Sequence, residues 1–162
     1  MKLFNPDNST FDSLDVKVEN HANEVRTTFH FLRDIGIPLD ERRVPGTSYS
    51  RQIGLWEKTC FELFIKNSSN SDYFEVNLSP DLNHWNAFYF EKYRTPLTQT
   101  DQITLKHVDV TQDSFAFTLN ISAGDYEFHP KMVLFLDQNS PIYLSDLKHP
   151  KTGPDFHIFS IT

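Results

Sequence analysis

Residues 55–90 hold the pattern that most limits the fold, because they read as three successive strands whose two faces differ in character. Alternate apolar residues form one face: Phe61, Leu63, Ile65, Phe74, Val76, Leu78, Phe88 and Phe90. The opposite face, called the second face below, carries Cys60, Glu62, Phe64, Tyr73, Glu75, Asn77, Trp85, Ala87 and Tyr89. This mixture is too polar for a core and too aromatic for a plain solvated surface. We interpret it as a ligand platform, a connected surface and not a second core.

The pairing register of the first two strands follows from the same pattern. The turn compositions of residues 67–71 and 79–83 separate the three strands. Only some pairings of these two strands place the apolar residues of both strands on the same face of the sheet. One of these places Glu62 opposite Asn77. Another places Glu62 opposite Glu75, a like-charge pair that costs energy unless a proton, a cation or an arginine lies between the acids.

The rest of the chain adds further short strands and no helix of three turns. The predicted strands are residues 14–19, 25–33, 102–110, 114–121, 131–136, 142–144 and 156–161, and residues 34–54 form an irregular connection. Fifteen Phe, six Tyr and only five Gly suit a sheet core built from rings. We predict an all-β, single domain over residues 1–162, an antiparallel sandwich or flattened barrel.

Charge and composition limit the partners. The net charge is −7, and Arg42 and Arg43 form the one adjacent basic pair, so there is no basic track for nucleic acid. The sequence has no apolar stretch of membrane-spanning length, and its first residues contain no apolar run of signal-peptide length. The single Cys60 cannot form an internal disulfide. We therefore expect a cytoplasmic protein with no nucleic-acid or membrane partner.

Three segments carry a family resemblance. The first segment is WEKTCFE from Trp56, and the second is YFEVNLSP from Tyr73 with the following Trp85. The third contains His149-Pro150 and the PDFH motif (154–157). Together these segments resemble the bacterial DOMON-like proteins. These are relatives of the family-9 carbohydrate-binding modules, and the strand layout agrees over nearly the whole chain. The resemblance implies a jelly-roll-type β-sandwich that holds a ligand, a sugar in the carbohydrate modules and haem in some DOMON domains.

We therefore expect a non-catalytic module that binds a small carbohydrate or a similar polyhydroxylated ligand. Aromatic rings stack on the C–H faces of sugars, and acids and amides bond the hydroxyls. The candidate ligand-binding residues are Trp56, Glu62, Glu75, Asn77, Trp85, Tyr89, Arg94, His149, Asp155 and His157. A core position is the alternative for each tryptophan. We expect the C-terminal group to lie beside the second face, Asp155 to pair with Arg94, and a neighbouring carboxylate to make His157 titrate between roughly pH 5 and 8.

Other functions stay open at this point. Glu62 and Glu75 with the histidine group suit a small glycosidase or a metal-dependent hydrolase. The aromatic face also suits a protein-interaction module. Haem ligation would need Met132, whose apolar strand favours a core role. No metal-binding spacing and no cofactor motif is present, so we predict neither, and nearby acids should raise the pKa of Cys60.

Overall fold

The computed structural model describes residues 1–37, 49–80, 83–136 and 140–159. Its strands are β1 (Lys2–Phe4), β2 (Thr10–His21), β3 (Glu24–Phe31), β4 (Ser50–Arg51), β5 (Cys60–Asn67), β6 (Tyr73–Leu78), β7 (His84–Phe90), β8 (Thr98–Gln99), β9 (Ile103–Val110), β10 (Ser114–Ile121), β11 (Tyr126–Phe135) and β12 (Pro141–Ser145). A single 3₁₀ turn, η1 (Leu55–Glu57), precedes β5 in this described part of the chain. The all-β class is confirmed.

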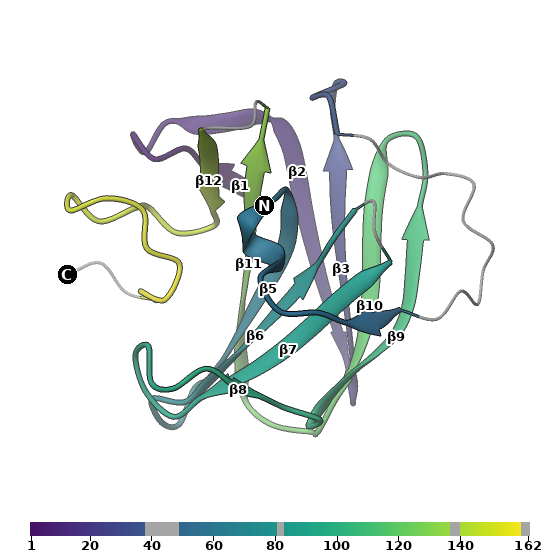
Figure 1. Cartoon of the computed structure of the whole chain (residues 1–162), viewed down its shortest axis with the longest axis vertical. Coiled ribbons are helices and arrows are strands. Elements are labelled where there is room, and N and C mark those ends of the chain that lie inside the picture. Colours follow the sequence, from purple (N-terminus) through teal and green to yellow (C-terminus); the bar gives the residue numbers. More distant parts are fainter. Residues whose placement is uncertain (38–48, 81–82, 137–139, 160–162) are drawn as a thin grey trace.

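The strands join into one hydrogen-bonded sheet. Its order is β4-β7-β6-β5-β11-β12-β1-β2-β3-β10-β9, with β8 paired to β7. Only β4 against β7 is parallel among the described pairs. The sheet curls, so that the β5–β7 half faces the β3, β10 and β9 half (Figure 1).

The first two strands pair in one of the two registers that the sequence left open, and the N-terminal strands form a hairpin. Glu62 lies opposite Asn77, and not opposite Glu75. In the hairpin, β2 and β3 pair from Leu14 with Phe31 to His21 with Glu24. Side-chain alternation excludes a slip by one residue, which would turn every apolar side chain out of the core. The like-charge cost of pairing Glu62 with Glu75 disfavours the slip by two residues.

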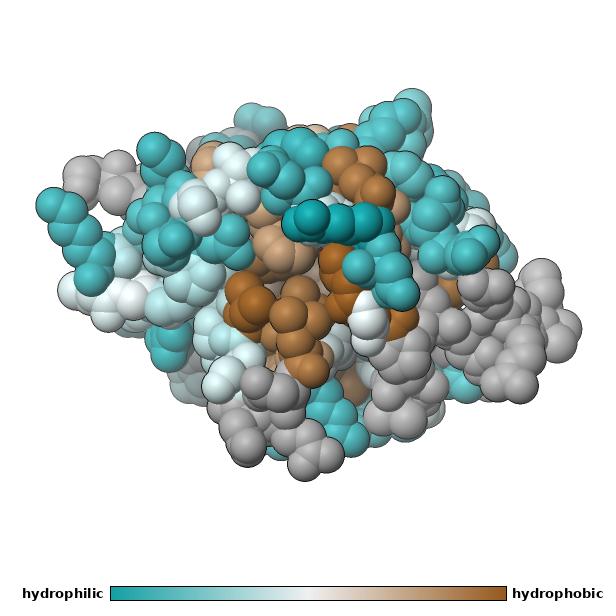
Figure 2. Space-filling model, turned by 90° about the horizontal axis from the view of Figure 1, so that it is seen from above, coloured by the Kyte–Doolittle hydropathy of each residue, from teal (hydrophilic) through white to brown (hydrophobic). Residues whose placement is uncertain are grey.

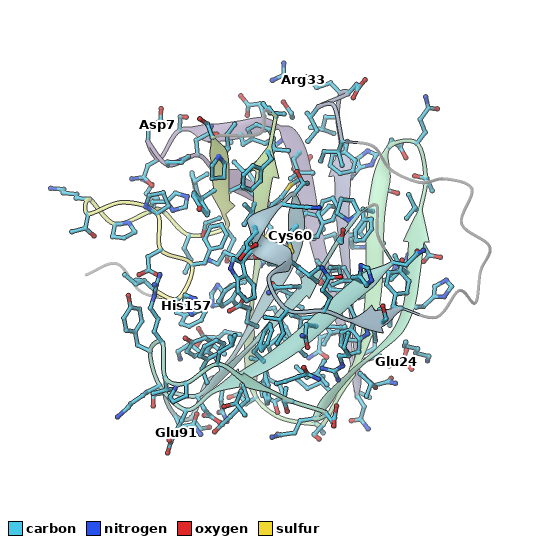
Figure 3. The ribbon with its side chains drawn as sticks, viewed as in Figure 1. Asp7, Glu24, Arg33, Cys60, Glu91 and His157 are labelled. Atoms are coloured by element: carbon cyan, nitrogen blue, oxygen red, sulfur yellow. The ribbon has the colours of Figure 1, made fainter. Side chains whose placement is uncertain are left out.

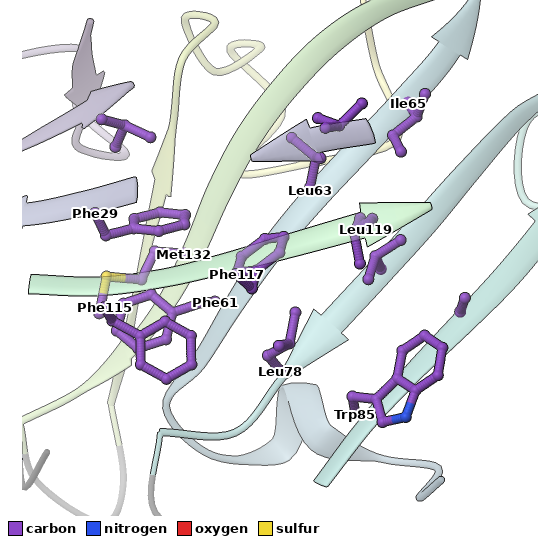
Figure 4. Packing of buried hydrophobic residues seen from close by; sticks show 14 of the residues in the cluster. Phe29, Phe61, Leu63, Ile65, Leu78, Trp85, Phe115, Phe117, Leu119 and Met132 are labelled. Carbon is purple, nitrogen blue, oxygen red and sulfur yellow. The ribbon is translucent and has the colours of Figure 1, made fainter. Parts of the chain in front are cut away.

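The main core fills the space inside the curl. Phe61 of β5 stacks on Phe115 of β10 with ring centroids 4.2 Å apart, and Phe29 of β3 lies 4.8 Å from Phe61. Figure 4 shows these rings with Met132 and Leu78 between the two halves of the sheet. The predicted apolar rows of β5, β6 and β10 all belong to this core.

The predicted face of β7 is wrong. Leu78 pairs with Trp85, Val76 with Ala87 and Phe74 with Tyr89, so these β7 residues share the main-core face. Phe88 and Phe90 point to the second face instead. The sequence misled because β7 is apolar on both faces, and its alternation alone does not say which set of rings meets β6.

The second face is covered, which corrects the expectation of an open platform. It holds a second apolar cluster of buried residues: Leu55, Cys60, Phe64, Tyr73, Phe88, Phe90, Val133 and Phe156. The cover consists of η1 and of residues 146–159, called the C-terminal segment below. All six residues of β6 are therefore buried. The segment carries no strand over residues 156–159, so the predicted strand 156–161 is wrong there, and residues 160–162 lie outside the described part.

Apolar side chains also reach the surface at one end of the molecule. Seen from above, they gather in a central hollow framed by hydrophilic residues (Figure 2). Leu32 and Leu136, which follow β3 and β11, are both exposed. Most of the predicted irregular connection, residues 38–48, lies outside the described residues.

No helix in the described ranges is long and apolar enough to cross a membrane.

Candidate functional site

A pocket of about 450 Å³ lies between the second face and its cover. Its floor comes from Glu62 and Phe64 of β5, Glu75 of β6 and Phe90 of β7. The rest of the lining comes from Trp56, Arg94, Thr95, Pro96, Leu97, Val133, Tyr143, Pro154, Asp155, Phe156 and His157. Segments that are far apart in the sequence therefore build one cavity with acidic and aromatic walls.

Glu62 is the pocket acid without a hydrogen-bond partner. Its side chain is 2% exposed and lines the cavity, and no donor in the described residues bonds its carboxyl group. Burial, followed by the negative charge of Glu75, raises the pKa of Glu62 well above 4.5, and Lys131 opposes this rise. These surroundings therefore favour the protonated form of Glu62.

Glu75, in contrast to Glu62, has a hydrogen-bond partner within the described part of the chain. The Asn77 Nδ2 group donates a hydrogen bond of 2.8 Å to Glu75 Oε1. The Asn77 Oδ1 atom is buried without a partner in the described residues. Burial raises the pKa of Glu75 to about 7, while the hydrogen bond from Asn77 and the charge of Arg94 lower it. Glu75 therefore changes charge near neutral pH.

Tyr73 joins the C-terminal segment to the sheet and orients His157. The Arg94 backbone N–H donates to the Tyr73 hydroxyl at 3.2 Å, and that hydroxyl lies 2.7 Å from His157 Nδ1. The Nε2 atom of His157 lies 3.8 Å from Glu75 Oε2, a hydrogen-bond acceptor. We therefore expect the ring proton of His157 on Nε2, with the Tyr73 hydroxyl donating its proton to Nδ1. Figure 3 shows His157 where the C-terminal segment comes beside the sheet.

The expected titration of His157 between roughly pH 5 and 8 is wrong in direction. Burial, followed by the charge of Arg94, lowers the pKa of His157 to about 4, although Asp155 opposes this. The neighbouring Glu75 does not supply a fixed negative charge near neutral pH, because its own pKa is about 7. Near neutral pH, Glu75 therefore titrates in this pocket and His157 stays neutral.

The predicted pairing of Arg94 with Asp155 is confirmed. Arg94 Nη2 lies 3.3 Å from Asp155 Oδ1, and the Tyr93 hydroxyl donates to Asp155 Oδ2 at 2.6 Å. These contacts tie the loop after β7 to the C-terminal segment. Arg94 has a φ of 48°, in the left-handed region that non-glycine residues rarely adopt. Such strain persists only where surrounding contacts hold it, and it is concentrated at functional sites.

Lys131 is a buried cation that sequence reasoning missed. It lies opposite Glu62 on β11 and is fully buried. Its ammonium group donates to Ser145 Oγ at 2.7 Å and to Asp146 Oδ1 at 2.9 Å. Asp146 also lies 2.8 Å from His129 Nδ1. Lys131 therefore has its own carboxylate partner, and it offsets only part of the negative charge of Glu62.

His149 does not line the pocket. Its backbone N–H donates to Asn8 Oδ1 at 2.6 Å, and its Nε2 lies 3.3 Å from the Phe4 carbonyl oxygen. Its ring centroid is 6.2 Å from that of Phe156. His149 therefore anchors the C-terminal segment on the N-terminal strands, while Asp155 and His157 reach the pocket as expected.

The three aromatic candidates for ligand binding lie in two different parts of the structure. Trp56 lines the pocket and packs its ring edge against Phe88, with centroids 5.9 Å apart. Trp85 is in the main core, with the Arg51 guanidinium 4.1 Å above its ring. Tyr89 packs on Phe74 at 5.5 Å on that same face. The expectation that Trp85 and Tyr89 bind ligand from the second face is wrong, because β7 has the opposite orientation.

The described residues supply little for metal or haem ligation. No three His, Cys, Asp or Glu side chains converge in the described ranges as a metal site would require. Met132 is fully buried in the main core, which is the role its apolar strand favours. Burial, followed by the charge of Glu62, raises the pKa of the Cys60 thiol, so the direction expected from the sequence is confirmed.

Sequence reasoning missed Tyr73, Phe64, Phe90 and Phe156 as site residues. Alternation places Tyr73 and Phe64 on the second face, so a signal for two of them was present. Phe156 gave none, because its contact with Phe64 at 6.3 Å joins distant parts of the chain.

Comparison with known protein families, curated proteins and solved structures finds no match to this chain.

Proposed function

We propose that this chain is a non-catalytic module that binds a small carbohydrate or a similar polyhydroxylated ligand in the pocket over the second face. The observation that carries the proposal is the combination of aromatic walls and buried acids around one cavity. Trp56, Phe90 and Phe156 offer apolar rings to the C–H faces of a sugar, and Glu62 and Glu75 offer oxygens to its hydroxyls.

The dimensions of the cavity agree with a small ligand. Sites for small molecules have volumes of roughly 300–1,000 Å³, and this pocket has about 450 Å³. The unpartnered Glu62 carboxyl group also supports binding, because a buried polar group without a partner costs free energy that a ligand hydroxyl would recover.

The other polar groups of the pocket already contact protein partners, which favours binding over catalysis. Glu75 accepts from Asn77, His157 shares a hydrogen bond with Tyr73, and Asp155 is held by Arg94. These groups are fixed in place by protein partners, which suits recognition of one ligand geometry. Glu62 alone among the pocket acids is left free for a bond to the ligand.

A small glycosidase is the second candidate. Glu62 and Glu75 share one face, and both carry raised pKa values, which is how a glycosidase keeps one carboxyl group protonated as its acid. A panel of nitrophenyl glycosides tests this. Turnover that disappears in both Glu62→Gln and Glu75→Gln would establish hydrolysis and overturn the non-catalytic proposal; no turnover in the wild type would reject the glycosidase.

We further propose that the curled sheet is a β-sandwich of the DOMON-like type, related to the family-9 carbohydrate-binding modules. The stacking of Phe61 on Phe115 across the main core supports two packed layers. The motifs around Trp56, Tyr73 and His149 support the family. The single cysteine supports a cytoplasmic setting, where a soluble saccharide would be the ligand.

Calorimetric titration with monosaccharides and disaccharides tests the binding proposal. Trp56→Ala should weaken binding by about 1–3 kcal/mol, because the ring would be a stacking surface at the site. Tyr89→Phe is the matched control, since it changes an aromatic residue on the other face. Equal affinity in wild type and Trp56→Ala, or the absence of binding across the panel, would contradict the proposal.

A further inference from the structure

The charge around the pocket is unbalanced. Its acids are Glu62, Glu75 and Asp155, and Arg94 is already paired with Asp155. Lys131, next to Glu62 across the β5–β11 ladder, is paired with Asp146. Glu62 and Glu75 therefore have no dedicated cation in the described residues. When both acids are ionised the pocket carries a surplus of negative charge.

One acid on the floor of the pocket, Glu62, is accessible to a ligand in the cavity. Glu62 is buried, lines the cavity and has no hydrogen-bond partner in the described part of the chain. The aromatic residues Trp56, Phe64, Phe90 and Phe156 line the same cavity. Aromatic rings attract cations through their negative faces, and more strongly away from water.

We propose that, among polyhydroxylated ligands, this pocket selects those that carry a protonated amine, with the carboxylate of Glu62 as the partner of the ammonium group. The inference rests on the proposed function of the pocket. An amino sugar supplies hydroxyl groups for the fixed polar groups, C–H faces for the rings and the cation that the two acids lack. A neutral sugar leaves the surplus negative charge, or the protonated acids, without compensation.

Binding of an amine should release protons. The titratable groups that interact with Glu62 are Cys60 on its own strand, Glu75 on β6 and Lys131 on β11, while Arg94, Asp155 and His157 line the same pocket. Of these, Glu75 has a pKa of about 7, and the pKa of Glu62 is higher than normal. An ammonium group in the pocket favours the ionised form of both acids, so binding near pH 7 should release protons.

Titration of the full chain with glucosamine, N-acetylglucosamine and glucose tests the inference. Glucosamine should bind roughly ten- to a hundredfold more tightly than either other sugar, the range expected for one bond to a charged group. Calorimetry in two buffers of different ionisation enthalpy should detect proton release with glucosamine only.

Variants assign the effect to Glu62. Glu62→Gln should remove the preference, so that glucosamine and glucose bind with similar affinity, while Glu91→Gln, at an exposed position after β7, should keep the preference. Glu62→Asp, which retains the charge, should keep part of it and checks that loss in the glutamine variant is not misfolding. Equal binding of glucose and glucosamine by the wild type overturns the amine inference but upholds the proposed function. Binding of none of the sugars overturns both.

Discussion

Replacing Glu62 by Gln should make the stability of the protein less dependent on pH. The folded state raises the pKa of Glu62 above its ordinary value of 4.5. A carboxyl group with a raised pKa stabilises the fold fully below its unfolded pKa, and this stabilisation is lost as the pH rises toward the folded pKa. Wild type should therefore lose stability, relative to Glu62→Gln, as the pH increases above about 5.

The size of the effect follows from proton linkage. Each pH unit between the unfolded and folded pKa values of one group changes the free energy of unfolding by about 1.4 kcal/mol. From pH 5.5 to 7.5, the stability of Glu62→Gln should thus rise relative to wild type, by up to about 1.4 kcal/mol for each pH unit. His157, whose low pKa changes stability in the opposite direction, is present in both proteins and cancels in the difference.

Urea unfolding of both proteins at four pH values between 5.5 and 7.5 measures this difference. Glu91→Gln is the control for loss of a negative charge at an exposed position. A stability difference between wild type and Glu62→Gln that stays constant over the pH range would refute the account, because it would mean that Glu62 is already ionised in the folded protein.

Three further predictions concern the core and the site. Trp85→Ala should destabilise the fold by about 3–5 kcal/mol in urea unfolding, as expected for a large core ring, and leave sugar affinity unchanged. A folded variant that binds sugar more weakly would show that Trp85 belongs to the ligand site. Asp146→Ala should cost about 3–5 kcal/mol because it leaves the buried Lys131 without its carboxylate, and a loss below about 1 kcal/mol would show that the pair is dispensable. His157 should remain neutral down to about pH 5 with its proton on Nε2, as read from ¹⁵N chemical shifts; a midpoint above pH 6, or a proton on Nδ1, would contradict the assigned contacts.

The sequence predicts the sheet well where one face of a strand is plainly apolar. The alternation of Phe61, Leu63 and Ile65 identifies the main-core face of β5, and it limits the register to pairings that include the observed one, with Glu62 opposite Asn77. The β2–β3 hairpin follows for the same reason. In these strands burial of one face decides the pairing, and local sequence contains that information.

The alternation of side chains does not predict how a strand is oriented where both of its faces are buried. Phe88 and Trp85 lie on opposite faces of β7, and each packs in an apolar cluster. The choice between them depends on the turn into β7 and on the cover over the second face. That cover comes from residues far along the chain, such as Phe156 and His157, whose contact with β5 and β6 is a tertiary event without a periodic signal.

Charge complementarity predicted one long-range contact. Arg94 and Asp155 are distant in sequence, yet the pairing expected from their charges is present. Lys131 shows the limit of the same reasoning. Its place within an apolar strand gives no sign that it is buried beside Glu62 and paired with Asp146.

The two tryptophans offer the most direct test of the claim that the covered pocket, and not the main-core face, is the ligand site. Because the chain contains two Trp residues, its ¹H–¹⁵N spectrum has two indole N–H signals, which Trp85→Phe assigns. On titration with glucosamine and with glucose, the Trp56 signal should shift and saturate with the ligand while the Trp85 signal stays in place. A saturating shift of Trp85 with Trp56 unchanged, or no shift of either signal, would contradict the account.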